Sequence, residues 1–410
     1  MKTDSRAFIL VLDGFGIGSA PDAADFGDLG ADTLGHIAEA CFKGRADRTG
    51  VRKGPLHLPF LESLGLGEAA KLAANRLPPG FNPVHPEGIY AACREISRGK
   101  DTSSGHWEMA GIPVLFDWDY FPDEPSFPET LIESLARQAE LPGILGNCHA
   151  SGTEIINRLG EEHLKSGKPI CYTSGDSVFQ VAAHQEQFGL ERLYELCRLA
   201  RNLLDREHLK IARVIARPFI GNAGNFTRTP NRKDYSVPPP EPTLLDRIVE
   251  RGHSVYAIGK ISEIFAHRGI SSSYKAPDNN GIFLLVNEAV EEAEGGSLTF
   301  ANFVDFDMLY GHRRDITGYA SALETLDRQL PELAHGLRPN DLAVITSDHG
   351  CDPGFPGSNH TREYVPALFF GPRVNPGSAG IRATLADIGQ TVARHLGIPP
   401  LKQGTAINLK

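Results

Sequence analysis

The most informative part of the sequence is the stretch TSDHGCD at residues 346–352, which is followed a few residues later by His360. It begins where an apolar run, LAVI at residues 342–345, ends. Such a short, continuous run is typical of a strand buried on both faces of a parallel sheet. Ligands bind outside the carboxyl ends of such strands, so Asp348, His349 and His360 are candidate metal ligands. The alternative is a polar surface loop with two histidines.

Two other predicted strands also end in candidate ligands. The run AFILVL ends directly before Asp13, and the run LTFANFV is followed by Asp307 and then His312. Together the six candidates are three carboxylates and three imidazoles: Asp13, Asp307, His312, Asp348, His349 and His360. They suffice for two divalent ions, and mixed imidazole and carboxylate ligands suit Mn²⁺ or Zn²⁺. Two neighbouring ions typically serve phosphoryl transfer.

The composition is that of a large globular enzyme. The 410 residues suffice for two or three domains, and 41% hydrophobic with 22% charged residues is ordinary. The net charge of −10 argues against a nucleic-acid partner. No apolar stretch is long enough to cross a bilayer, so we expect no membrane partner. The six scattered cysteines, without a C-x-x-C motif, predict reduced thiols in a cytoplasmic protein.

A cluster of hydroxyl residues lies in the stretch GKDTSSGHWEMAG at residues 99–111. A dimetal phosphotransferase needs an activated water or a protein nucleophile, and a metal or base can activate a Thr or Ser hydroxyl. The alternative is a helix N-terminus capped by Asp101 or Thr102. Both interpretations can hold together, because a helix N-terminus would also favour an anionic phosphoryl group.

The character of the sequence changes between residues 116 and 234. Prolines and acidic residues mark an exit from the core, and five prolines between residues 230 and 242 mark a return. We therefore predict a metal-binding catalytic core of residues 1–115 and 235–410, interrupted by an inserted α/β cap domain of residues 116–234 that binds substrate.

The insertion carries a second set of polar residues. It comprises Asp176 within SGDS, then His184 and Glu186, and the arginines Arg213, Arg217, Arg228 and Arg232. Clustered arginines commonly form a solvated face. In a domain that serves a dimetal site they could instead bind a phosphate through two parallel hydrogen bonds.

Helical periodicity marks further segments of the core. Residues 33–41 are amphipathic and have Asp32 as N-cap, which predicts a helix. A leucine-rich pattern predicts another helix, interrupted by Pro331. The last helix is expected to begin at Thr384 as N-cap. Residues 44–88, rich in Gly, Pro and Arg, are predicted to be loops with one short helix.

Over essentially its whole length the sequence resembles the bacterial-type phosphopentomutases of the alkaline phosphatase superfamily. The motifs that carry the resemblance are VLDGFGIG (11–18), GKDT (99–102), GHWE (105–108), IARPF (215–219), RTPNR (228–232), NFVDFD (302–307), YGHRRD (310–315) and TSDHGCDP (346–353). GKDT and YGHRRD are specific to this family, whereas the Asp and Asp-His pieces fit any superfamily member. The resemblance implies an alkaline-phosphatase-like α/β core, with a mainly parallel sheet flanked by helices.

The resemblance also implies the metal ligands and the nucleophile. Two Mn²⁺ per chain would be held by two sets, one of Asp307, His312 and His360 and the other of Asp13, Asp348 and His349. Thr102 would contact the second ion and carry the phosphoryl group as phosphothreonine. The sequence departs from the family pattern at Ser104, where a second threonine is expected, so the nucleophile lies among three adjacent hydroxyls, those of Thr102, Ser103 and Ser104.

The substrates follow from the same resemblance. They would be ribose and 2-deoxyribose phosphates, interconverted between the 1- and 5-positions in nucleoside catabolism, with a sugar bisphosphate as activator. Arg217 and Arg232 would bind the distal phosphate, and Asp176 the sugar hydroxyls.

Two alternatives to this function can be distinguished by sequence features. A related dimetal phosphomutase or phosphatase acting on another phosphate ester would be favoured by a serine in the nucleophile position and by the absence of an arginine-rich insertion. A catalytically inactive sugar-phosphate-binding protein would be expected to lack some of the candidate ligands, and all six are present.

Overall fold

The structure is a computed structural model, and it describes residues 4–122, 124–175 and 177–410. The chain forms two compact units. The first comprises the residues up to 116 together with 239–410, and the second comprises residues 117–238.

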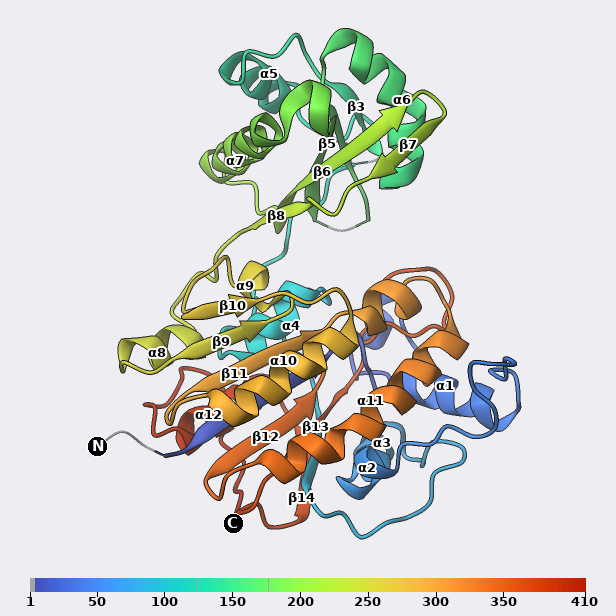
Figure 1. Ribbon diagram of the computed structural model, residues 1–410, viewed down its shortest axis with the longest axis vertical. Coiled ribbons are helices and arrows are strands. Elements are labelled where there is room, and N and C mark those ends of the chain that lie inside the picture. Colours follow the sequence, from blue (N-terminus) through green and yellow to red (C-terminus); the bar gives the residue numbers. More distant parts are fainter. Residues whose placement is uncertain (1–3, 123, 176) are drawn as a thin grey trace. The chain divides into compact units, whose positions relative to one another are not determined.

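The first unit is built on an eight-stranded sheet in the order β10-β9-β11-β1-β12-β13-β2-β14 (Figure 1). The strands are β1 (Arg6–Leu12), β2 (Ile89–Cys93), β9 (Val255–Ile258), β10 (Ser272–Tyr274), β11 (Leu298–Phe303), β12 (Asp341–Thr346), β13 (Val365–Phe370) and β14 (Gly377–Arg382). The five strands from β10 to β12 are all parallel, whereas β13 is antiparallel to both of its neighbours. The predicted mainly parallel α/β sheet is confirmed.

The three strands that carry candidate ligands lie side by side at the centre of this sheet. β1 pairs with β11 on one side and with β12 on the other, and Val11 is opposite both Asn302 and Thr346. Every residue of these strands is buried, as their continuous apolar runs predict. Because the strands are parallel and in this register, the residues that follow them meet at one edge of the sheet.

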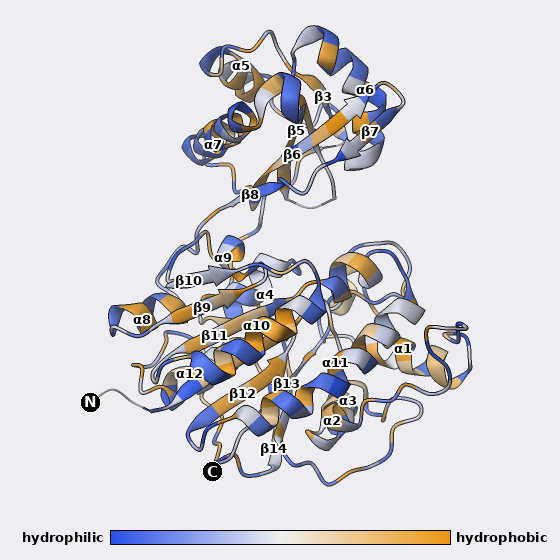
Figure 2. Ribbon diagram, viewed as in Figure 1, coloured by the Kyte–Doolittle hydropathy of each residue, from blue (hydrophilic) through white to orange (hydrophobic). Residues whose placement is uncertain are grey.

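Helices and helical turns cover the sheet. They are η1 (Ala23–Phe26), α1 (Thr33–Phe42), α2 (Pro59–Ser63), α3 (Leu66–Ala74), α4 (Thr102–Met109), α8 (Leu244–Glu250), α9 (Ile261–Ile264), α10 (Asn279–Glu292), η3 (Phe306–Gly311), α11 (Ile316–Gly336) and α12 (Ala386–His395). Apolar side chains of α1, α10 and α11 form one core with those of β1, β11 and β12. In Figure 2 the central strands are mainly hydrophobic, whereas the helices also carry hydrophilic residues.

The predicted helix at residues 33–41 is confirmed as α1, and the Asp32 side chain accepts a hydrogen bond from Gly35 N at 2.9 Å. Three other local predictions are wrong. Pro331 does not interrupt α11, which continues to Gly336 because buried leucines on both sides of the proline keep it against the core. Residues 44–88 contain two short helices, α2 and α3. The N-cap of α12 is Leu385, one residue later than predicted, although the Thr384 hydroxyl still accepts a hydrogen bond from Ala386 N at 3.1 Å while it donates to Glu108 at 2.7 Å.

The second unit has its own sheet and its own core. Its six strands are β3 (Leu145–His149), β4 (Ile170–Thr173), β5 (Val178–His184), β6 (Arg213–Asn222), β7 (Asn225–Arg228) and β8 (Lys233–Ser236). Its helices and helical turn are α5 (Glu129–Gln138), α6 (Gly152–Ser166), η2 (Gln185–Gly189) and α7 (Leu190–Arg206). Phe127, Phe179 and Leu193 are buried in a core formed within the unit. Among the residues that the structure describes, in either unit, no helix combines the length and the apolar character needed to cross a membrane.

Candidate metal centre

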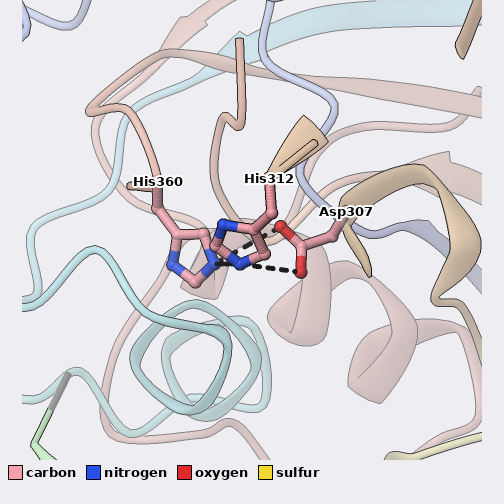
Figure 3. Close-up of side chains that lie close together, drawn as sticks. All are labelled: Asp307, His312 and His360. Atoms are coloured by element: carbon pink, nitrogen blue, oxygen red, sulfur yellow. Dashed lines mark hydrogen bonds and ion pairs between the residues drawn. The ribbon is translucent and has the colours of Figure 1, made fainter. Parts of the chain in front are cut away.

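The first group of candidate ligands, Asp307, His312 and His360, converges in the structure (Figure 3). Asp307 lies in η3, a π-helical turn that follows β11, and His312 comes directly after this turn. The Nε2 atoms of both histidines lie 3.3 Å from Asp307 carboxylate oxygens. The same two Nε2 atoms are 3.1 Å apart. π-Helical turns are frequent at functional sites because they redirect side chains within a helix.

Backbone carbonyls fix the orientation of both imidazole rings in this group. His312 Nδ1 lies 2.6 Å from the Ser358 carbonyl oxygen, and His360 Nδ1 lies 3.1 Å from that of Lys100. Each ring therefore donates its Nδ1 proton to the backbone and turns the Nε2 lone pair towards Asp307. Metal-binding histidines typically show this arrangement.

The second group, Asp13, Asp348 and His349, lies at the ends of β1 and β12. His349 Nε2 lies 3.5 Å from Asp13 Oδ1 and 3.3 Å from Asp348 Oδ2. His349 Nδ1 faces the Gly350 carbonyl oxygen at 3.1 Å, so this ring also presents its Nε2 atom to carboxylates. All three side chains are buried.

The two groups are adjacent, and Thr102 lies beside them. The rings of His349 and His360, one from each group, stack with their centroids 3.9 Å apart. Thr102 is the first residue of α4, and its Oγ1 lies 3.3 Å from His349 Nε2. The structure therefore brings all six candidate ligands and one hydroxyl into a single site.

The other two hydroxyls of the cluster are placed differently from that of Thr102. Asp101 is the N-cap of α4 and accepts hydrogen bonds from Ser103 N at 3.0 Å and Ser104 N at 3.2 Å. Ser104 Oγ also donates to Asp101, at 2.6 Å, and is fully buried. Ser103 is buried as well, whereas Thr102 is partly exposed. The helix N-terminus considered as an alternative is therefore present, and it coexists with a hydroxyl directed at His349.

The electrostatics of the site favour binding of a cation. Burial, and then the charges of Asp348 and Asp307, raise the pKa of Asp13 to about 8. Burial also opposes the ionisation of Asp307, but its interactions with His360 and His312 outweigh burial and hold its pKa well below the usual range. Carboxylates so close together oppose one another's ionisation, and a divalent cation would relieve this repulsion.

Unsatisfied oxygen atoms point to the same conclusion. Within the described part of the chain, Asp13 Oδ1, Asp307 Oδ1 and Asp348 Oδ2 are buried and accept no hydrogen bond. Buried polar atoms are normally satisfied, and three orphaned carboxylate oxygens in one site are what metal coordination would explain. The residues present therefore fit divalent metal ions.

Sequence reasoning assigned no role to two buried residues that support this site. Asn302, near the end of β11, donates to Asp13 Oδ2 at 3.0 Å. His106, on α4, places its Nδ1 3.2 Å from Asp348 Oδ2 and 2.8 Å from the Thr102 carbonyl oxygen. His106 lies in the motif GHWE and Asn302 in the motif NFVDFD. The position of Asn302 near the end of a predicted strand could have indicated its role in the site.

The second unit holds the predicted substrate-binding arginines. Arg217 Nε donates to Gln180 Oε1 at 3.1 Å, and Arg232 forms two hydrogen bonds with Asp234, at 2.7 and 2.6 Å. Burial, and then the charges of Arg232 and nearby Arg228, lower the pKa of Arg217 to about 10. Asp176, the remaining predicted site residue, lies outside the described residues.

Comparisons with known proteins place the chain in a class. A model of the metalloenzyme superfamily matches residues 5–400. The solved structure of Leishmania mexicana phosphoglycerate mutase, obtained at low cobalt concentration, is similar in fold over 100% of this chain and 98% of that one, with a TM-score of 0.50 and 14% identity. The protein is therefore a member of the metalloenzyme superfamily, and it uses divalent metal.

Curated relatives narrow the class further. The phosphopentomutase of Rhizobium meliloti is 62% identical over 397 residues, which cover 96% of this chain and 97% of the relative. The phosphopentomutase of Rhizobium johnstonii is 60% identical over 398 residues, covering 96% and 98%, and that of Agrobacterium fabrum is 59% identical over 399 residues, covering 96% and 97%. The chain belongs to the phosphopentomutase family. The predicted family and enzyme class are confirmed.

Proposed function

We propose that this enzyme interconverts ribose 1-phosphate and ribose 5-phosphate, and the corresponding 2-deoxyribose phosphates, through a phosphothreonine at Thr102. The names of its relatives support the substrate class. The observation that carries the proposal is the position of Thr102 Oγ1, which lies 3.3 Å from His349 Nε2 and beside two groups of metal ligands. Among the three adjacent hydroxyls it is the one with partial exposure.

We further infer two Mn²⁺ ions per chain. Asp307, His312 and His360 would hold one, and Asp13, Asp348 and His349 the other, in agreement with the two ligand groups. Mixed imidazole and carboxylate ligands suit Mn²⁺. When bound, the ions supply positive charge that stabilises the phosphoryl group during its transfer.

The reaction begins with a phosphoryl group on Thr102 Oγ1. The oxygen of the free sugar hydroxyl forms a bond to phosphorus, and the bond between phosphorus and Thr102 Oγ1 breaks. The hydroxyl proton goes to the departing Oγ1, so the products are a pentose bisphosphate and a free threonine. The same step in reverse, on the other phosphate, restores phosphothreonine and releases the isomeric monophosphate. A sugar bisphosphate would act as activator by rephosphorylating Thr102 after hydrolysis.

The second unit is proposed to bind the substrate as a cap domain. Arg217 and Arg232 would bind the distal phosphate, and Asp176 the sugar hydroxyls. The arginine cluster supports this role, because burial and then the charges of neighbouring arginines lower the pKa of Arg217, and a bound phosphate dianion would offset the repulsion among those charges. The bidentate contact with Asp234 holds the Arg232 guanidinium in one orientation, in which it would also bind the distal phosphate.

The proposed setting is nucleoside catabolism in the cytoplasm. All six cysteines are free and buried, which suits a reducing compartment.

One assay tests the proposed reaction. Purified protein loaded with Mn²⁺ is incubated with ribose 1-phosphate, and ribose 5-phosphate and inorganic phosphate are both measured. The expected result is ribose 5-phosphate with little inorganic phosphate. Thr102→Val serves as the control and should form neither product. Inorganic phosphate as the main product would instead identify a phosphatase, and the proposed function would be wrong.

A further inference from the structure

The motif GHWE places a carboxylate, Glu108, in the interior beside the site. Its side chain is fully buried, and it accepts hydrogen bonds from five donors. The donors are Ile96 N at 3.0 Å, Ser97 N at 2.7 Å, Ser97 Oγ at 2.6 Å, Thr384 Oγ1 at 2.7 Å and Leu385 N at 3.0 Å. Within the described part of the chain no Lys, Arg or His forms a direct ion pair with it, and Arg362 acts on its charge only from a distance, so these donors are its direct partners.

The five donors come from two segments outside α4. Ile96 and Ser97 lie in the loop between β2 and α4, and Thr384 and Leu385 lie at the start of α12. Glu108 therefore joins the C-terminal half of α4 to the loop that precedes it and to another helix. The Thr384 hydroxyl also accepts a hydrogen bond from Ala386 N, at the start of α12, at 3.1 Å, so one hydroxyl connects Glu108 to the first turn of that helix.

Helix α4 depends on such polar contacts for its position. It has only eight residues, and all of them from Ser103 to Met109 are buried, so it has no single apolar face directed at a core. Its middle residue, Gly105, packs directly against the metal-ligand strand end, since an added Cβ would lie 2.2 Å from the Asp348 carbonyl oxygen. With the helix in contact with Asp348, a shift or tilt at its C-terminal end moves Thr102 at its other end. Glu108 is six residues from Thr102, about 9 Å along the helix axis.

We propose that Glu108 is a positioning residue that holds α4 so that Thr102 Oγ1 stays aligned at His349. The inference rests on the proposed role of Thr102. It explains why a buried carboxylate without an ion-pair partner in direct contact lies in the helix that carries the nucleophile. Removing the carboxylate would leave the backbone fold in place but would loosen the helix at the site.

Glu108→Gln is the main test, because glutamine keeps the volume while its amide nitrogen would face N–H donors instead of accepting from them. We expect kcat to fall by about 100-fold, since misplacement of a reacting group by about 1 Å costs a factor of that order. The KM for ribose 1-phosphate should stay within about twofold of the wild type, because the proposed sugar-binding residues are untouched. Phosphate on Thr102, measured by mass spectrometry after incubation with ribose 1,5-bisphosphate, should fall in parallel with kcat.

A matched variant separates positioning from general stability. Asp341 is a buried carboxylate paired with Arg6 at the opposite end of β12, so Asp341→Asn should lower the melting temperature strongly and leave the kcat of the folded enzyme nearly unchanged. If Glu108→Gln does not fold, Thr384→Val removes one of the five donors and should lower kcat several-fold at constant KM.

Glu108→Gln and Thr384→Val both disturb the contacts of Glu108. The proposal is overturned if the variant that folds keeps the wild-type kcat and normal phosphorylation of Thr102. It is also overturned if kcat falls no more than in Asp341→Asn at equal loss of melting temperature. A wild-type enzyme that takes phosphate on Thr102 but fails to convert ribose 1-phosphate would refute the proposed function alone, and the phosphorylation readout would still decide the role of Glu108.

Discussion

The close approach of α4 to the metal-ligand loop makes Gly105→Ala an informative perturbation. The added Cβ would lie 2.2 Å from the Asp348 carbonyl oxygen and 2.9 Å from the Asp348 Cβ. Ordinary contacts between carbon and oxygen begin near about 3.3 Å, so α4 or the loop must move by about 1 Å. Overpacking of this kind costs about 1–3 kcal/mol of unfolding free energy. A displacement of Thr102 by about 1 Å relative to the two groups of candidate metal ligands should also lower kcat by about 100-fold.

The assay measures kcat and KM for ribose 1-phosphate together with the melting temperature. Gly336→Ala is the control, because Gly336 lies at the end of α11, where a new Cβ would meet Val290 Cγ1 at 2.7 Å. This control should lose stability and keep its kcat. A Gly105→Ala enzyme with wild-type kcat, in a folded protein, would show that the contact between α4 and Asp348 does not set the position of Thr102.

Four further outcomes are expected. Thr102→Val should abolish turnover and protein-bound phosphate, which mass spectrometry of the intact protein measures. Asp307→Ala or His360→Ala should halve the bound metal, measured by elemental analysis, because each removes a ligand of one proposed ion only; unchanged metal content in both would contradict the ligand assignment. Arg217→Ala should raise the KM for ribose 5-phosphate by about 10-fold or more, as loss of a charge-assisted contact costs about 1.5–3 kcal/mol. Burial raises the pKa of Asp327 from 3.8 to about 6, so the folded state binds this proton more tightly than the unfolded state does. The unfolding free energy should therefore fall as the pH rises from about 4 to about 6. Urea titrations at several pH values measure this slope, and Asp327→Asn should flatten it.

The sheet and the convergence of candidate ligands could be predicted because they depend on local pattern. A continuous apolar run predicts a buried strand, and a parallel sheet collects strand ends at one edge. Asp13, Asp307 and Asp348 each follow such a run within a few residues, so their meeting needed no knowledge of side-chain packing. Their roles as ligands stay predictions.

The remaining features depend on contacts between segments that are distant in the sequence. The Thr384 hydroxyl accepts a hydrogen bond from Ala386 N, as a capping rule predicts, but it also donates to Glu108, 276 residues away, which no local rule predicts. Pro331 removes one hydrogen bond from α11, but burial of the neighbouring leucines outweighs that local cost. Periodicity and capping rules contain no information about such partners, so they fail where tertiary contacts compete with local preference.

Glycines explain how ligands from separate segments can lie so close together. An added Cβ on Gly14, directly after Asp13, would lie 2.8 Å from Cys351 Cβ, and one on Gly311, directly before His312, would lie 2.6 Å from Cys351 Sγ. Gly14 also has a positive φ of 76°, which L side chains rarely adopt. The backbones that carry Asp13 and His312 therefore both pack against Cys351, three residues after Asp348. A site assembled from adjacent strand ends needs this backbone contact as well as its ligands, because larger residues at these positions would push the two ligand groups apart.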